Sequence, residues 1–162
     1  MIRLAGLGML LLLAEPVAAR DSLGVFDRWA AFRDAAPRRC YAIARPQGAA
    51  APAGTVASVA IWPERKVRGQ VHLVLSRAVA EGAPVRLRIG AQDFALIAKG
   101  RNAWGANARV DAGIVAAMRS ASSMIVNARS SSSGGGFADR YTLAGAATAI
   151  DAAAVGCARP AS

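Results

Sequence analysis

Residues that commonly carry out catalytic chemistry are scarce in this chain. His72 is the single histidine, and it lies in a segment predicted to be a strand. A hydrolase triad would need a serine beside this imidazole and a carboxylate to orient it, yet no serine stands in a G-x-S-x-G turn. A zinc site needs three or more converging ligands, which one histidine and two cysteines expected to be bonded to each other do not supply. We therefore predict no catalytic residue, no metal site and no cofactor, and we expect His72 to be a surface or edge residue.

Two other segments could form a polar site. Asp139, Arg140 and Tyr141 stand together at a loop-to-strand boundary, and could act as a functional trio. We favour a structural interpretation, in which Asp139 is a turn carboxylate, Arg140 is solvated and Tyr141 packs on the sheet. Residues 130–136 have the glycine content of a phosphate-binding loop but neither its G-x-x-x-x-G-K-[ST] spacing nor a lysine, so they predict a mobile loop.

The basic residues are the strongest candidates for binding. The chain has 20 lysines and arginines against 10 acidic residues, which gives a formal net charge of +10. The candidate anionic-ligand residues form two groups, a basic turn with Arg65, Lys66 and Arg68, and a strand with Arg86 and Arg88. Arginine pairs bidentately with phosphate and carboxylate, which suits an anionic lipid, lipopolysaccharide or an acidic glycan. The alternative is that these arginines are scattered over a solvated face of the sheet and bind nothing. The sequence favours neither the binding role nor this alternative. We expect the three tryptophans to be core residues rather than ligand platforms.

The N-terminal residues 1–19 have the pattern of a signal peptide. Arg3 precedes an apolar run, Pro16 breaks it, and small residues lead to a cleavage point after Ala19. The run is about eleven residues long, whereas a membrane-spanning helix needs ~20. We expect cleavage and export to the periplasm, the cell envelope or the medium, with no transmembrane segment and no nucleic-acid partner. A retained N-terminal anchor is the alternative.

The expected location bears on the bonding state of the two cysteines, Cys40 and Cys157. Two cysteines in an exported chain favour a disulfide over a metal site or reactive thiols. A Cys40–Cys157 bond would tie together the two ends of the domain and stabilise it by roughly 4–5 kcal/mol. Two unpaired thiols are the alternative.

Short apolar segments separated by turns predict about eight strands and two short helices. The residues from 85 to 89 alternate most clearly, with Leu87 facing the core and Arg86 and Arg88 facing solvent. The first helix would be capped by Asp111 and would bury Ile114, Val115 and Met118. The spacing favours an antiparallel β-sandwich over alternating βαβ units. The other predicted strands cover residues 29–32, 40–44, 57–62, 71–75, 94–97 and 124–126, and a last strand begins at Asp139.

The remaining segments are predicted to be connections or ends. Residues 64–69 form a basic turn and residues 100–109 a connection. The second helix covers residues 146–155 and is held chiefly by Cys157. The domain boundaries are residues 1–19 for the signal peptide, 20–28 for a flexible leader, 29–158 for the β domain and 159–162 for a tail.

The order and spacing of these residues resemble the invasion-associated locus B family, exported proteins of alphaproteobacteria. The resemblance covers almost the whole mature chain. It implies an immunoglobulin-like β-sandwich, an envelope location and, for founding members, a part in host-cell entry, and it brings no catalytic residues. The segments that carry it are Val85 to Gly90, Phe94 to Leu96, Ala103-Trp104, Asp111 to Arg119, Met124 to Val126, and Asp139 to Leu143 followed by Gly145, Ala149 and Cys157.

The leading hypothesis is therefore an exported, non-enzymatic envelope protein of the invasion-associated locus B type that acts by binding a host-cell or envelope partner. The alternative is a structural periplasmic protein that binds anionic envelope polymers through an arginine-rich face. An unrecognised hydrolase is a third hypothesis, which the shortage of titratable residues disfavours.

Overall fold

A computed structural model of the chain describes residues 20–48 and 51–158. The predicted signal peptide and the predicted tail lie outside the described residues. Within them the chain forms ten strands, two α-helices and a short 3-10 helix. The strands are β1 Arg20–Phe26, β2 Trp29–Asp34, β3 Arg39–Ala44, β4 Val56–Trp62, β5 Val67–Val74, β6 Val85–Ile89, β7 Gln92–Lys99, β8 Asn102–Gly105, β9 Ser123–Arg129 and β10 Gly136–Thr142; the helices are η1 Pro63–Arg65, α1 Ala108–Ser120 and α2 Ala146–Ala158.

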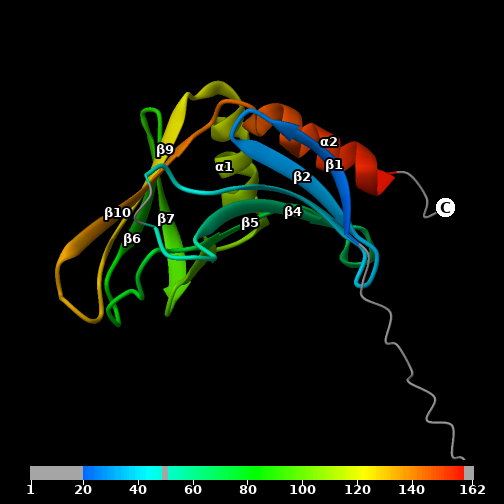
Figure 1. Ribbon diagram of the computed structural model, residues 1–162. Coiled ribbons are helices and arrows are strands. Elements are labelled where there is room, and N and C mark those ends of the chain that lie inside the picture. The colour runs from blue at the N-terminus through cyan, green and yellow to red at the C-terminus, as the bar shows by residue number, and fades with distance from the viewer. Residues whose placement is uncertain (1–19, 49–50, 159–162) are drawn as a thin grey trace, which may run out of the picture.

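All ten strands pair antiparallel in one sheet, in the order β1-β2-β3-β4-β5-β8-β7-β6-β9-β10. The sheet is strongly curved, with β1–β5 on one side of Figure 1 and β6, β7, β9 and β10 on the other. The predicted fold, mainly antiparallel β with two helices and one disulfide, is confirmed. The curvature is compatible with the predicted immunoglobulin-like sandwich, although pairing continues through all ten strands without a break.

One face of the sheet carries the core. Directly paired residues such as Trp29, Ala44, Ala57 and Leu73 all point to this inner face and are buried. The predicted alternation of β6 is confirmed, since its odd-numbered residues are buried and its two arginines are exposed. The outer face is consequently the one on which the sequence places most of its polar and charged residues.

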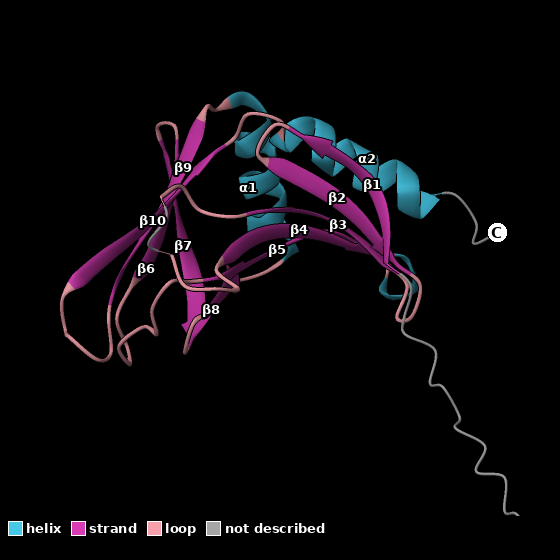
Figure 2. Ribbon diagram, viewed as in Figure 1, coloured by secondary structure: helices cyan, strands magenta, loops and turns pink. Residues whose placement is uncertain are grey.

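The two helices divide the inner face between them, as Figure 2 shows. Helix α2 packs on β1–β4 and helix α1 on β5–β8. The prediction that Cys157 chiefly holds α2 was incomplete, because α2 also buries a row of small residues that bring it close to the sheet. Gly156 is one of these, since a Cβ there would overlap the side chain of Leu23 on β1.

Helix α1 begins earlier than predicted. Its N-cap is Asn107, whose side chain accepts hydrogen bonds from the backbone N–H groups of Arg109 (3.0 Å) and Val110 (3.1 Å). The predicted cap, Asp111, lies inside the first turn and packs against Gly105. Burial raises the pKa of this carboxyl group, and the nearby backbone N–H groups of Val71 and Gly105 oppose that shift without cancelling it. Of the predicted apolar stripe, Ile114 and Met118 are buried, and Val115 is half-buried against the core.

Two strands were missed in the sequence. Arg20–Phe26 was predicted to be a flexible leader, but it forms β1, paired with β2 along its length. Most of its residues are polar or exposed, so apolar alternation gives no signal; ion pairs from Arg20 to Asp34 and from Arg33 to Asp21 help hold it. Asn102–Gly105 was predicted to be a connection, but it forms β8 between β5 and β7, too short to show a period.

The predicted Cys40–Cys157 disulfide is present and joins β3 to the last turn of α2, with the two Cα atoms 5.6 Å apart. The loop predicted at residues 130–136 connects β9 to β10, and it is tied down by backbone hydrogen bonds from Ser130 to Gly135 and from Gly134 to Ser130.

Candidate binding site

The three basic residues predicted near the middle of the chain lie at one corner of the sheet. Arg65 ends η1, Lys66 follows it with a left-handed φ of 55°, and Arg68 lies in β5. We call Arg65, Lys66 and Arg68 the basic corner. The predicted turn extended to Gly69, which was wrong, because β5 already starts at Val67. Strand geometry rather than a loop therefore sets the direction of Arg68.

A β-bulge at Gly69 determines which way Arg68 points. Ala60 pairs with Gln70, but the next residue, Ile61, pairs with Arg68, so Gly69 is the extra residue. Its φ of 89° is a conformation that glycine adopts readily. The bulge reverses the alternation of β5, so that Arg68 faces the same side as Ile61. That side is the inner face, where an arginine would not be expected from the pattern of β5.

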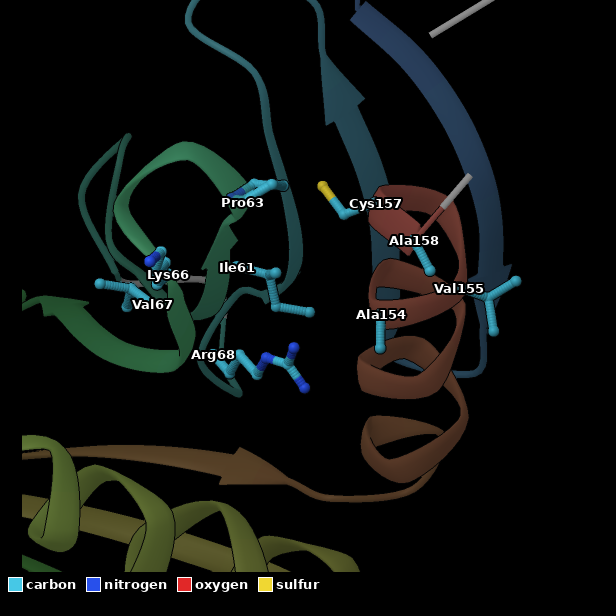
Figure 3. A pocket seen from close by; sticks show the side chains of 9 residues that line it. All are labelled: Ile61, Pro63, Lys66, Val67, Arg68, Ala154, Val155, Cys157 and Ala158. Carbon is cyan, nitrogen blue, oxygen red and sulfur yellow. The ribbon is translucent and has the colours of Figure 1, made fainter. Parts of the chain in front are cut away.

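A groove of about 720 Å³ opens beside the basic corner, between the sheet and α2. One wall comes from β4, η1 and β5 and consists of Ile61, Pro63, Lys66, Val67 and Arg68. The other comes from α2 and consists of Ala154, Val155, Cys157 and Ala158. Figure 3 shows the guanidinium group of Arg68 extending toward Ala154. The groove is mostly apolar with two cations on one wall, and its size lies in the range of small-molecule sites.

The disulfide fixes the helical wall of this groove. Cys157 is bonded to β3, and its carbonyl oxygen accepts a hydrogen bond of 3.1 Å from Arg38 Nη2. An arginine at a helix C-terminus satisfies a carbonyl that has no partner within the helix. Both interactions hold the last turn of α2 in place.

On the outer face, the basic corner continues into a row of stacked arginines and aromatic rings. The guanidinium of Arg65 lies 4.9 Å from the centroid of the Trp62 ring, and that of Arg39 lies 5.3 Å from the same ring. Arg39 also lies 4.8 Å from the Tyr41 ring, and Arg20 lies over Tyr41 and Phe32, 5.8 Å from each. We call these six residues, Arg20, Phe32, Arg39, Tyr41, Trp62 and Arg65, the arginine–aromatic row. The row was not predicted from the sequence, in which Trp62 was expected to be a core residue.

Asp34 organises the row. Its carboxylate accepts hydrogen bonds from Arg39 Nε (2.8 Å) and Arg20 Nε (3.1 Å). Burial acts to raise the pKa of Asp34, but the hydrogen bonds from Arg39 and Arg20 outweigh it, and the pKa lies below its usual value. The carboxylate is therefore ionised at neutral pH and holds two guanidinium groups over the rings.

The other predicted basic pair is placed differently. Arg86 and Arg88 are exposed on the outer face of β6, which β8 and β7 separate from β5. Arg88 donates two hydrogen bonds of 2.8 Å to the carboxylate of Asp93. These bonds raise the pKa of Arg88 and lower that of Asp93. The structure therefore places Lys66 and Arg68 on the groove and Arg65 next to them on the outer face, and it does not bring the five predicted residues together as one site.

The remaining candidates occupy ordinary structural positions. His72 lies on β5, half-buried, with Nε2 3.0 Å from Asn102 Oδ1, and β5 is an interior strand rather than an edge. Asp139 is not the predicted turn carboxylate, because it is buried in β10 and accepts a hydrogen bond from the backbone N–H of Ser76 (2.8 Å). Arg140 is exposed, as predicted. Tyr141 is packed on the sheet as predicted. Burial raises its pKa, and the nearby charge of Asp139 raises it further.

Among residues 20–48 and 51–158, no three histidine, cysteine or acidic side chains are grouped so that they could hold a metal ion. Within the same ranges, neither helix has the length and apolar character to cross a membrane. The absence of enzyme activity stays a prediction.

Comparison with known proteins gives one informative match. No family model matches the sequence, and no curated protein matches it. The crystal structure of invasion associated protein B from Bartonella henselae superposes with a TM-score of 0.67 at 14% sequence identity, over 84% of this chain and 98% of that one. The chain has the fold of invasion associated protein B. The resemblance drawn from the sequence is thus confirmed at the level of the fold, and fold alone does not fix function.

Proposed function

We propose that the chain is an exported, non-enzymatic protein of the invasion-associated locus B type that binds an anionic ligand of the envelope or of a host-cell surface through its basic corner. The observation that carries the proposal is the position of Lys66 and Arg68 on the wall of the groove, with Arg65 next to them at the end of η1. Among the residues that the structure describes, no carboxylate forms an ion pair with any of the three. Their charge is available to a ligand.

The overall charge supports this proposal. A net charge of +10 on a domain of this size attracts anionic partners over a distance of about one Debye length, ~8–10 Å at moderate salt. An exported protein meets phospholipid head groups, lipopolysaccharide and acidic glycans. The shared fold with a protein described as invasion associated adds support for the envelope or host-cell setting.

The arginine–aromatic row favours a second candidate, a structural periplasmic protein that binds anionic envelope polymers. The row crosses β1, β2, β3 and β4, so its guanidinium groups are spread over several strand spacings of roughly 4.8 Å. Such a spread suits an extended acidic chain better than a single head group. Arginines stacked on rings keep N–H groups available for carboxylate or phosphate.

Vesicle co-sedimentation tests the proposal. The mature protein should sediment with vesicles that contain anionic phospholipid and remain in solution with neutral ones. Binding should be lost at 1 M salt, where the Debye length falls to ~3 Å. Equal binding to both kinds of vesicle, or binding that salt does not change, contradicts it. Competition by an acidic polysaccharide at lower concentration than by lipid would favour the second candidate.

A further inference from the structure

The groove beside the basic corner has the composition of a site for an amphiphile. We propose that it takes the hydrocarbon chain of a free, single-chain anionic amphiphile such as a long-chain fatty acid, with Arg68 holding the carboxylate. This inference rests on the proposed function and specifies its ligand class. In this arrangement the carboxylate of the ligand contacts the basic residue at the edge of the groove, and its hydrocarbon chain lies in the apolar groove.

The apolar part of the site is the inner face left between the sheet and α2. Ile61 and Val67 line it from the strands, and Ala154 from the helix. Alanine on the helical wall leaves room that a larger side chain would fill. Val155 also lines the groove and is 53% exposed. It is one of three exposed large hydrophobic residues in the described part of the chain. Covering such surface with a hydrocarbon chain is favourable because it removes apolar area from water.

The charged part of the site is Arg68, and the backbone conformation of β5 determines where it points. The bulge at Gly69 turns Arg68 onto the inner face opposite Ile61, where regular alternation would have pointed it away. Lys66 lines the same wall. Bulges are common beside functional sites because they redirect a side chain. A guanidinium at the edge of an apolar groove matches a carboxylate on a hydrocarbon chain, and a bidentate pair is among the stronger polar contacts.

An acidic polymer fits this groove less well. A polysaccharide or a nucleic acid has few apolar groups to place against Ile61 and Ala154, and the arginine–aromatic row offers it a polar surface instead. A membrane surface would engage the exposed cations without placing a chain in the groove. Both alternatives predict binding that does not depend on the length of a hydrocarbon chain.

Isothermal titration of the mature protein distinguishes these cases. The probes are dodecanoate below its micelle concentration, hexanoate, and the uncharged dodecyl maltoside. We expect dodecanoate to bind at least about tenfold more tightly than hexanoate, because each added methylene contributes to burial. We also expect it to bind at least about tenfold more tightly than dodecyl maltoside, which lacks the charge.

Variants locate the binding. Ala154→Phe fills the groove and should weaken dodecanoate binding at least about tenfold by removing the space for the chain. Thr148→Phe, at an exposed position earlier in α2, is the matched control and should bind as the unaltered protein does. Arg68→Ala changes an exposed side chain, tests the head-group contact without filling the groove, and should also weaken binding. Thermal melts confirm that each variant is folded.

The outcomes separate this inference from the proposed function. Equal affinity for dodecanoate and hexanoate, or unchanged binding by folded Ala154→Phe and Arg68→Ala, overturns the groove as an acyl-chain site. If salt-sensitive binding to anionic vesicles persists in that case, the proposed function stands and the membrane surface is the partner. If vesicle binding is absent as well, the proposed function fails together with the inference.

Discussion

The basic corner and the β6 arginine pair consist of nearly the same residue types, but the fold gives them different surroundings. Lys66 and Arg68 border an apolar groove of about 720 Å³, and Arg65 lies over the Trp62 ring next to them. None of the three has an ion-pair partner among the described residues. Arg88 is paired with Asp93, and Arg86 lies beside it on the exposed outer face of β6. Both regions are therefore positively charged, but only the basic corner adjoins a concave apolar surface.

The largest effect should come from breaking the disulfide that holds the groove wall. Replacing Cys40 and Cys157 by alanine removes a cross-link between residues 117 apart and should lower the free energy of unfolding by about 4–5 kcal/mol. Chemical denaturation measures this loss. Dodecanoate binding should fall as well at a temperature where the variant is still folded, since the last turn of α2 loses its anchor. A variant as stable as the parent would show that the bond does not support this region.

The core beneath the β6 pair provides the next test. Leu87 is 0% exposed, and Leu87→Ala should cost about 2–5 kcal/mol in the free energy of unfolding. Arg86→Ala and Arg88→Ala should leave the melting temperature almost unchanged, because both side chains face solvent. If the arginine changes unfold the protein and Leu87→Ala does not, the register of β6 is inverted.

The bulge can be tested separately from the charge it directs. Gly69→Ala forces a non-glycine residue into a φ of 89° and should cost about 1–3 kcal/mol. It should also weaken anionic-ligand binding by moving Arg68 away from the groove. Gly82→Ala is the matched control, with a φ of 69° and open space around it. It should destabilise similarly and bind normally; equal losses of binding in both would mean that the bulge does not position Arg68.

The smallest effect concerns the pH dependence of two carboxylates. The pKa of Asp34 is lowered in the folded state, so its ionised form stabilises the fold above the unfolded value of about 3.9, and that stability is lost as pH falls further. Asp34→Asn should therefore flatten the decline of melting temperature between neutral pH and strong acid. Asp93→Asn should do so less, because the Arg88–Asp93 pair is exposed and screened by salt. A larger change for Asp93→Asn would contradict the organising role given to Asp34.

The sequence predicted most of the fold, because alternation and cysteine usage are local or compositional signals. The period of residues 85–89 and the Cys40–Cys157 pair are both confirmed. It did not reveal β1, whose polar residues carry no alternation and depend on pairing with β2. Asn107 was overlooked as a cap because Asp111 stands closer to the apolar stripe.

The site was predicted only in part, because it depends on tertiary placement. The residues of the basic corner were identified by charge, but the groove requires α2, which is almost ninety residues further along the chain, to pack beside β4 and β5. The bulge at Gly69 is visible in the sequence only as a glycine among basic residues. The arginine–aromatic row arises from cross-strand neighbours such as Phe32 and Tyr41, whose pairing no single segment encodes.

The most direct test of the difference between the two regions removes the same number of charges from each. The variants are Lys66→Ala with Arg68→Ala, and Arg86→Ala with Arg88→Ala, compared in binding to anionic vesicles at low salt. The first should bind about thirtyfold more weakly than the parent, since each basic residue near an anionic surface contributes ~1 kcal/mol. The second should bind almost as the parent does. Equal losses in the two variants, or a loss confined to the β6 pair, would contradict the assignment of the binding site to the basic corner.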